Sequence, residues 1–231
     1  MKMGSLALSA IFWIASLLLT LWIVRCPSDQ LILSASLCAL SPVFTLILTW
    51  LSDGRIVISG QRTEARPDAI ALLFLPSLGL AIRALGPIHI INWQAALIYA
   101  AVIGVVWSGL AYFSGTFGRQ RGKLIITSVL FLIGLAYGYG VVCLIDTLAD
   151  SAPPKITEVI VLNKYVGAGR GHTPYLVLAP SPVNPEGGVK AVSQDVYQSA
   201  TVGQKVCLVE RPGAIGLGWY EILTCEHKLS T

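Results

Sequence analysis

The chain has 231 residues, of which 55% are hydrophobic and only 12% charged. A soluble domain carries roughly 25% charged residues, so this composition excludes an ordinary soluble protein. The net charge of +4 arises mostly in residues 1–150, which hold nine Lys/Arg against six Asp/Glu, whereas residues 151–231 hold seven against six and give no electrostatic basis for binding nucleic acid.

Residues 1–150 predict an α-helical membrane bundle of five transmembrane helices. A helix needs roughly 20 apolar residues to cross a hydrocarbon core of about 30 Å. Four stretches contain no charge over this length, namely 5–24, 31–51, 94–114 and 124–145. A fifth, 69–91, is interrupted by Arg83 and by the pair Gly86-Pro87. It crosses only if Arg83 extends its guanidinium to the headgroups or the helix continues past it.

The loop charges predict the orientation. With five spans, one side of the membrane collects seven Lys/Arg and the other side collects two before the tail begins. Since basic residues stay cytoplasmic, the N-terminus is predicted inside and residues 151–231 outside. If the third segment does not cross, one side of the membrane has five Lys/Arg and the other has four, so the charges no longer favour either orientation. The seven are Lys2, Arg55, Arg62, Arg66, Arg119, Arg121 and Lys123, and the two are Arg25 and Arg83.

Residues 151–231 predict a small extramembrane β domain. A Pro-rich exit at 151–154 ends the last helix, because proline cannot continue it. Short β-branched runs separated by Gly- and Pro-rich turns then predict about five strands, with one helical turn at 195–200. A single hairpin cannot bury a core, so a small all-β barrel or sandwich is the expected result. The strands are 156–166, 173–180, 189–193, 205–210 and 219–225.

Two cysteines of the tail, Cys207 and Cys225, fall in consecutive predicted strands. If the tail lies in an oxidising compartment, they are placed to form a disulfide that staples a small domain. The alternative is two independent thiols buried in the core, where free cysteine is common.

The chain contains no pattern typical of catalysis or of a cofactor site. Its three histidines lack Cys, Asp or Glu neighbours at metal-ligand spacing, and no nucleophile motif occurs. The run at 167–171 lacks the lysine and serine of a phosphate-binding loop. We therefore expect no catalytic residue, no metal and no cofactor.

Four small residues and two charged residues in or next to the predicted spans are candidates for helix packing and for an ion pair. Gly134 and Gly138 form GxxxG, and Gly104 and Ser108 form a similar pair, which favours close helix packing within the bundle or, alternatively, a dimer face. Arg83 either reaches the headgroups or forms a buried pair with an acidic group such as Asp146.

Two glycine-rich connections are candidate partner-binding loops, because loops on a β scaffold often carry recognition. The first, 167–172, offers Arg170 and His172 as polar anchors. The second, 212–218, offers Ile215 and Leu217 as exposed apolar side chains, unless they fold back onto the domain.

Several segments resemble an uncharacterised family of proteobacterial multi-span inner-membrane proteins with a C-terminal periplasmic β domain. The resemblance runs from about residue 50 onward and is carried by ARPDAIALLFLPSLGLAIRAL, LAYGYGVV, YLVLAP, VGQKVCL and PGAIGLGWY. It implies a multi-pass protein of the bacterial inner (plasma) membrane and supplies no catalytic residue.

Two classes of function remain open from the sequence. The first is a non-catalytic membrane protein that displays its β domain to a protein partner, in an assembly, accessory or immunity-type role. The second is a small-molecule permease or channel subunit, although the spans lack the central Asp, Glu, Lys or His that ion-coupled transporters use. Besides the lipid bilayer, a homodimer or hetero-complex is compatible with either class.

Overall fold

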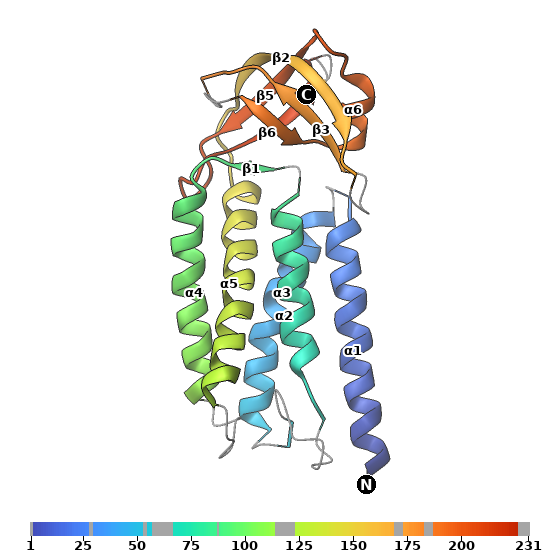
Figure 1. Cartoon of the computed structure of the whole chain (residues 1–231). Coiled ribbons are helices and arrows are strands. Elements are labelled where there is room, and N and C mark those ends of the chain that lie inside the picture. The colour runs from blue at the N-terminus through green and yellow to red at the C-terminus, as the bar shows by residue number, and fades with distance from the viewer. Residues whose placement is uncertain are drawn as a thin grey trace. The chain divides into compact units, whose positions relative to one another are not determined.

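The computed structural model describes residues 2–27, 30–52, 55–56, 67–86, 88–113, 123–168, 173–182 and 187–225. The chain divides into two compact units (Figure 1). The helical unit comprises Met1–Ala84 and Gln94–Leu144, and the β unit comprises Leu85–Trp93 and Ile145–Thr231. The short segment between the third and fourth helices therefore belongs with the C-terminal residues, which the sequence did not predict.

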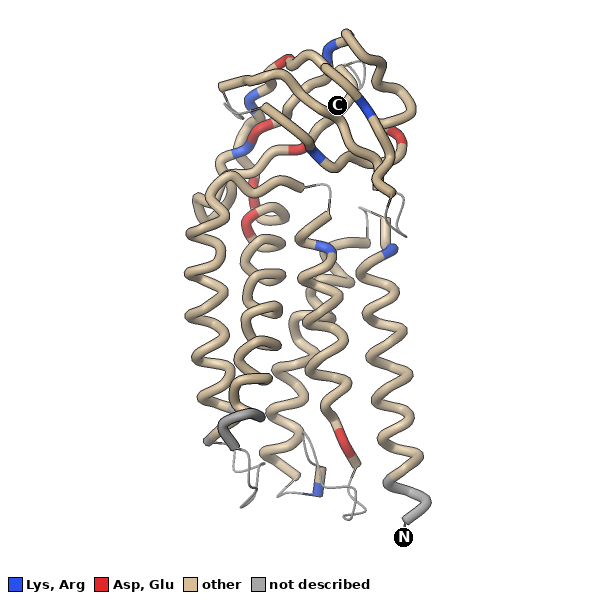
Figure 2. The backbone as a smooth tube through the Cα atoms, viewed as in Figure 1, with Lys and Arg blue, Asp and Glu red and all other residues tan. Residues whose placement is uncertain are grey.

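Among the described residues, four helices are long and apolar enough to cross a membrane, which marks the chain as a membrane protein by length and composition. They are α1 (Lys2–Arg25), α2 (Leu31–Leu51), α4 (Trp93–Phe113) and α5 (Lys123–Leu148). Charged residues are sparse along these helices and denser in the β unit (Figure 2). Each of the four covers one of the charge-free stretches predicted from the sequence.

The fifth predicted span is shorter than expected. α3 (Ile70–Ala84) has 15 residues, so at 1.5 Å per residue it is roughly 22 Å long, against a hydrocarbon core of about 30 Å. The prediction that the helix extends to residue 91 is wrong. The helix ends before Gly86-Pro87, because the ring of Pro87 disfavours a helical conformation at the residue before it.

Although short, α3 lies alongside α1 over most of the depth of that helix. At its start, the backbone N–H of Asp68 donates to Ser9 Oγ of α1 at 3.0 Å. Further along, Gly79 packs so closely that a Cβ on it would lie 2.8 Å from Ile23 and 3.1 Å from Thr20. The two helices are therefore parallel from Ser9 to at least Ile23.

Small residues bring α4 and α5 into contact within the chain. A Cβ on Gly134 would lie 3.0 Å from the Cα of Gly104, and one on Gly138 would lie 2.9 Å from the carbonyl oxygen of Ala100. Ser108 is buried in the same helix and donates to the Gly104 carbonyl at 2.7 Å. The predicted small residues thus lie where α4 and α5 contact each other within the chain. This contact accounts for them more directly than a dimer interface would.

Two further contacts join α5 to the other helices. Tyr137 stacks on Trp107 of α4 with a ring separation of 5.2 Å, and its hydroxyl donates to the Ala39 carbonyl of α2 at 2.9 Å. A Cβ on Gly140 would lie 2.7 Å from Leu80 of α3, so these two helices touch backbone to backbone. The glycines of α5 are therefore needed to fit it between α3 and α4.

The β unit is one six-stranded antiparallel sheet curled into a half-barrel, with strand order β1-β6-β5-β2-β3-β4. The five strands that follow α5 match the runs expected from the sequence. They are β2 (Lys155–Val166), β3 (Pro174–Leu178), β4 (Gly188–Ala191), β5 (Lys205–Arg211) and β6 (Trp219–Thr224). The sixth, β1 (His89–Ile90), comes from the segment between α3 and α4.

A short helix, α6 (Gln194–Ser199), packs against the concave core of this sheet through Val196. Ser193 caps its first turn by accepting from the Val196 N–H. Lys164 of β2 caps its last turn, since Nζ donates to the carbonyls of Tyr197 at 3.2 Å and Ala200 at 2.7 Å. The remaining core is aliphatic and includes Val159, Val161, Leu176, Leu178, Val206, Leu208 and Ile222.

His89 of β1 connects the two edges of the half-barrel. It lies opposite Tyr220 of β6 and stacks on its ring at 5.0 Å. Its Nε2 is 3.1 Å from the carbonyl of Ala191, the last residue of β4. A carbonyl can only accept, so Nε2 carries the proton in this bond. Burial lowers the pKa of His89, and the nearby Lys190 acts in the same direction, so the imidazole is neutral at neutral pH.

Candidate functional site

Two aspartates near the end of α5 hold the loop 212–218, which connects β5 to β6. Asp146 is fully buried, with 0% of its surface exposed. Its Oδ1 accepts from the N–H of Ile215 at 2.9 Å and of Leu217 at 3.4 Å, and its own carbonyl accepts from the N–H of Ala214 at 2.9 Å. Three backbone N–H groups of the loop are therefore bound by one residue.

Asp150, one helical turn later in the chain, binds the beginning and end of the same loop. Its Oδ1 accepts from the N–H of Ala152, and its Oδ2 accepts from the N–H of Gly213 at 2.9 Å and from Trp219 Nε1 at 3.2 Å. These bonds, that of Ala152 foremost, lower the pKa of Asp150, and the charge of Arg211 adds to the effect. Asp150 is thus an ionised acceptor at neutral pH.

Gly213 is required at the point where the loop meets Asp146. Its φ is +78°, a left-handed conformation that favours glycine, and a Cβ would collide with the Asp146 carboxylate. From the other direction, the N–H groups of Ile91 and Asn92 donate to the carbonyls of Gly218 and Leu217 at 2.9 and 3.0 Å. The loop is therefore held both by residues 91–92 and by residues 146–150.

This arrangement anchors the loop and offers no proton donor or nucleophile. The Asp146 carboxylate accepts backbone N–H groups of the loop, and its pairing with Arg83, one of two alternatives for that arginine, stays a prediction. For the two apolar side chains of this loop, exposure and folding back were both open. Ile215 is 43% exposed, whereas Leu217 is 2% exposed, as expected from the alternative in which it folds back.

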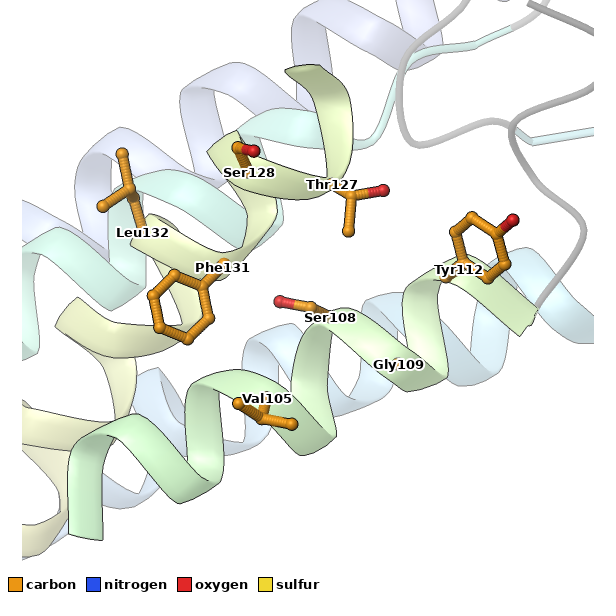
Figure 3. Close-up of a pocket in the computed structure, with 8 residues that line it drawn as sticks. All are labelled: Val105, Ser108, Gly109, Tyr112, Thr127, Ser128, Phe131 and Leu132. Atoms are coloured by element: carbon orange, nitrogen blue, oxygen red, sulfur yellow. The ribbon is translucent and has the colours of Figure 1, made fainter. Parts of the chain in front are cut away.

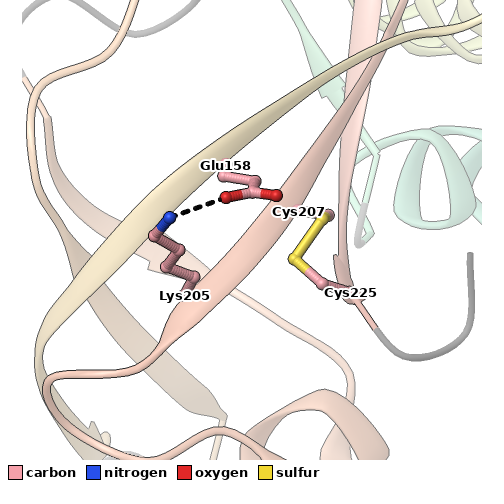
Figure 4. A network of polar contacts seen from close by, with 4 residues as sticks. All are labelled: Glu158, Lys205, Cys207 and Cys225. Atoms are coloured by element: carbon pink, nitrogen blue, oxygen red, sulfur yellow. Dashed lines mark hydrogen bonds and ion pairs between the residues drawn. A yellow bond between two sulfur atoms is a disulfide. The ribbon is translucent and has the colours of Figure 1, made fainter.

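The cysteine pair lies at the ends of β5 and β6 that are remote from the loop 212–218. Figure 4 shows the pair together with Lys205 and Glu158. The Sγ atoms of Cys207 and Cys225 are at disulfide distance, 2.13 Å, with their Cα atoms 5.1 Å apart. Beside them, Lys205 Nζ donates to Glu158 Oε2 at 2.8 Å. Both side chains of this ion pair are more than half exposed, so it adds little to stability.

The outer surface of the sheet is mostly apolar along the β2–β3 hairpin, with the exposed Asn163 opposite Val177 as its polar member. Leu176 and Leu178 of β3 point into the core, so the alternating residues Tyr175 and Val177 point outward. The register carries this surface onto β2, where Tyr165 lies opposite Tyr175 with the two rings stacked at 5.5 Å.

The same surface continues across both neighbouring strands. Val177 lies opposite Val189 of β4, which is exposed. Leu162 is also exposed and lies at the irregularity in β2, between Val161 and Asn163. We call these five side chains the outer apolar face, formed by Leu162, Tyr165, Tyr175, Val177 and Val189.

Two predicted anchors, Arg170 and His172, lie outside the described residues. They belong to the connection between β2 and β3, whose flanking pair is described: the N–H of Gly167 donates to the carbonyl of Thr173 at 2.9 Å. The outer apolar face is therefore built on the hairpin that carries this connection.

Three buried serine and threonine hydroxyl groups in the helical unit are directed to their own helices. Ser16, Thr45 and Ser77 each donate to the carbonyl four residues earlier, at 2.6, 2.8 and 2.6 Å. Such bonds satisfy the hydroxyl without forming a polar route between helices. These three residues thus give no support to a permease. Among the described residues, no cluster of His, Cys, Asp or Glu is placed to hold a metal ion.

Comparisons with known proteins add no relative: no family model, curated protein or solved structure matches the chain. The class of the protein therefore follows from its own features. It is a helical membrane protein whose described part holds four apolar helices of spanning length and a curled antiparallel half-barrel with a cysteine pair.

Proposed function

We propose that this chain is a non-catalytic protein of the bacterial inner membrane that displays its β unit in the periplasm and binds a protein partner through the β2–β3 hairpin. The observation that carries this proposal is the outer apolar face. Apolar side chains gathered on an exposed surface mark sites of protein interaction, and tyrosine is enriched in binding hot spots.

Five spans are part of the proposal, with α3 as the third. α3 is short, but it is parallel to α1 from the level of Ser9 to that of Ile23 and continues five residues past Gly79. A helix that follows its neighbour over this depth crosses the same layer, and local thinning or long flanking side chains accommodate the remaining mismatch. The loop charges then put the N-terminus in the cytoplasm and the β unit in the periplasm.

The cysteine pair agrees with this placement. Disulfides persist in the periplasm and are rare in the cytosol. Cys207 and Cys225 are the two cysteines of the β unit and lie at disulfide distance from each other, whereas Cys26 and Cys38 are buried free cysteines of the helical unit. Pairing confined to the β unit is the distribution expected if that unit alone folds in an oxidising compartment.

A photo-reactive amino acid introduced in place of Tyr165 is expected to cross-link a discrete protein partner in growing cells. The same substitution at Ile215 is the matched control, because the two side chains are similarly exposed, at 41% and 43%, on different parts of the β unit. Mass spectrometry of the cross-linked product identifies the partner. Adding Arg170→Ala and His172→Ala is expected to weaken the product from position 165.

Cross-linking from position 215 but not from position 165 would move the partner to the loop 212–218. The absence of a protein adduct from either position would contradict the proposal that the β unit binds a partner.

A further inference from the structure

A groove of about 530 Å³ lies between the end of α4 and the beginning of α5 (Figure 3). None of the eight residues that line it is charged, and its buried hydroxyl, that of Ser108, donates to the carbonyl of Gly104 in the same helix. The groove therefore indicates no particular ligand. The β unit offers a more selective surface at the edge of its sheet.

β4 is an edge strand, with β3 on one side and no strand on the other. The N–H of Val192 donates to the carbonyl of Pro174, so residues 188, 190 and 192 direct their backbone groups toward β3. The residues between them direct theirs the opposite way, because the two directions alternate along an antiparallel strand. The N–H and C=O of Val189 therefore point away from the sheet, where they have no partner among the described residues.

His89 of β1 closes one end of this edge and leaves the other end open. The carbonyl of Ala191 also points away from β3, and it accepts from His89 Nε2. Val189, two residues earlier, is 50% exposed, and a Cβ added to Gly188 would meet nothing within 4 Å. The unpaired backbone groups of Val189 are thus accessible to another chain.

Two side chains of β4 indicate what a strand added to this edge would carry. Val189 lies opposite Val177 on the outer apolar face, so an apolar neighbour is favoured beside it. Lys190 lies opposite the buried Leu176, on the other face of the sheet, and has no ion pair within the described part of the chain. A lysine on the inner face of an edge strand discourages indiscriminate pairing, since an added strand must supply a compensating charge.

On the basis of the proposed function, we propose that the protein partner adds an extended segment to the edge of β4. Its backbone bonds to the N–H and C=O of Val189, and two consecutive residues place an apolar side chain beside Val189 and an acidic side chain beside Lys190. The added segment extends the outer apolar face by one strand. In such strand addition the main-chain hydrogen bonds supply affinity and the flanking side chains supply specificity.

Two short synthetic peptides test the chemistry of the added segment. Both alternate valine with threonine, and at the centre one carries a glutamate and the other a lysine. Their binding to the full-length protein in detergent is measured by fluorescence anisotropy. We expect the glutamate peptide to bind about fivefold more tightly, because opposite charges across a strand pair attract and like charges repel. Lys190→Glu should reverse this preference.

Val189→Pro tests the backbone of the edge. Proline removes the outward N–H, and because this N–H makes no bond to β3, proline is tolerated there as it is in other edge strands. Val189→Pro should abolish binding of both peptides. Val189→Ala is the matched control, since it keeps the N–H and should retain most of the binding. The temperature at which protease cleaves the β unit checks that both variants fold, and Lys190→Glu tests the proposal even if Val189→Pro does not.

Three results would overturn strand addition at β4. They are the absence of binding by either peptide, a preference that Lys190→Glu does not reverse, and equal binding by Val189→Pro and Val189→Ala. A protein cross-linked from position 165 would still support the proposed function in each of these cases. Peptide binding without any cross-linked protein in cells would instead contradict the proposed function and leave β4 as a strand-binding edge.

Discussion

Replacing Asp146 by alanine is expected to lower the free energy of unfolding of the β unit by about 3 kcal/mol. The side chain is fully buried and accepts two loop N–H groups, from Ile215 and Leu217. Alanine would leave both donors buried without a partner, and such orphaned groups cost about 1–3 kcal/mol each. For a unit of this size, the loss corresponds to a fall in melting temperature of roughly 15 °C.

The measurement is protease cleavage of the β unit in the detergent-solubilised full-length protein as the temperature rises. Asp195→Ala is the control, because Asp195 is exposed at the start of α6, and a surface substitution of this kind changes stability by less than about 0.5 kcal/mol. If Asp146→Ala and Asp195→Ala melt together, Asp146 does not anchor the loop.

Breaking the cysteine pair is expected to destabilise the β unit by about 3 kcal/mol, the value for a bond that closes a loop of 18 residues. Cys225→Ser is the suitable variant, because Cys225 is only half-buried whereas Cys207 lies in the interior. A reductant should lower the melting temperature of the unaltered protein to that of Cys225→Ser.

The reductant should have no further effect on Cys225→Ser, which provides the internal control. Non-reducing mass spectrometry of the protein purified from cells should find the peptides of Cys207 and Cys225 linked. Free alkylation of both thiols under denaturing, non-reducing conditions would show that the pair is reduced in the cell and would remove one support for a periplasmic β unit.

Most of the helices and strands could be predicted because each is long enough to carry its own pattern. The four uncharged stretches became α1, α2, α4 and α5, and the β-branched runs became β2 to β6. β1 could not be predicted, because His89 and Ile90 are too few to show a period of two. They form a strand only because β6 pairs with them.

The length of α3 and its place in the bundle have different causes. Hydropathy alone extends the span to residue 91, but the helix ends before Gly86, because a proline follows that residue. The residues after the helix belong to the β unit. What keeps so short a helix in the bundle is its contact with α1 at Gly79 and with α5 at Gly140. Neither contact is visible in a sequence window.

The anchoring role of Asp146 was also beyond sequence reasoning, which sought a charged partner for it. Its partners are backbone N–H groups about 70 residues away, and every loop offers these regardless of side chain. The available indications were Asp150 one turn later and the glycine-rich loop 212–218. Gly213 in particular is explained by its positive φ and by its contact with the carboxylate.

We propose that five helices cross the membrane and leave the β unit in the periplasm. The most direct test is a set of topology reporters fused after residues 60, 90, 120 and 231. Five spans predict cytoplasm after 60 and 120, and periplasm after 90 and 231. If α3 does not cross, the fusions after 90 and 231 report cytoplasm and the fusion after 120 reports periplasm, which would contradict the account.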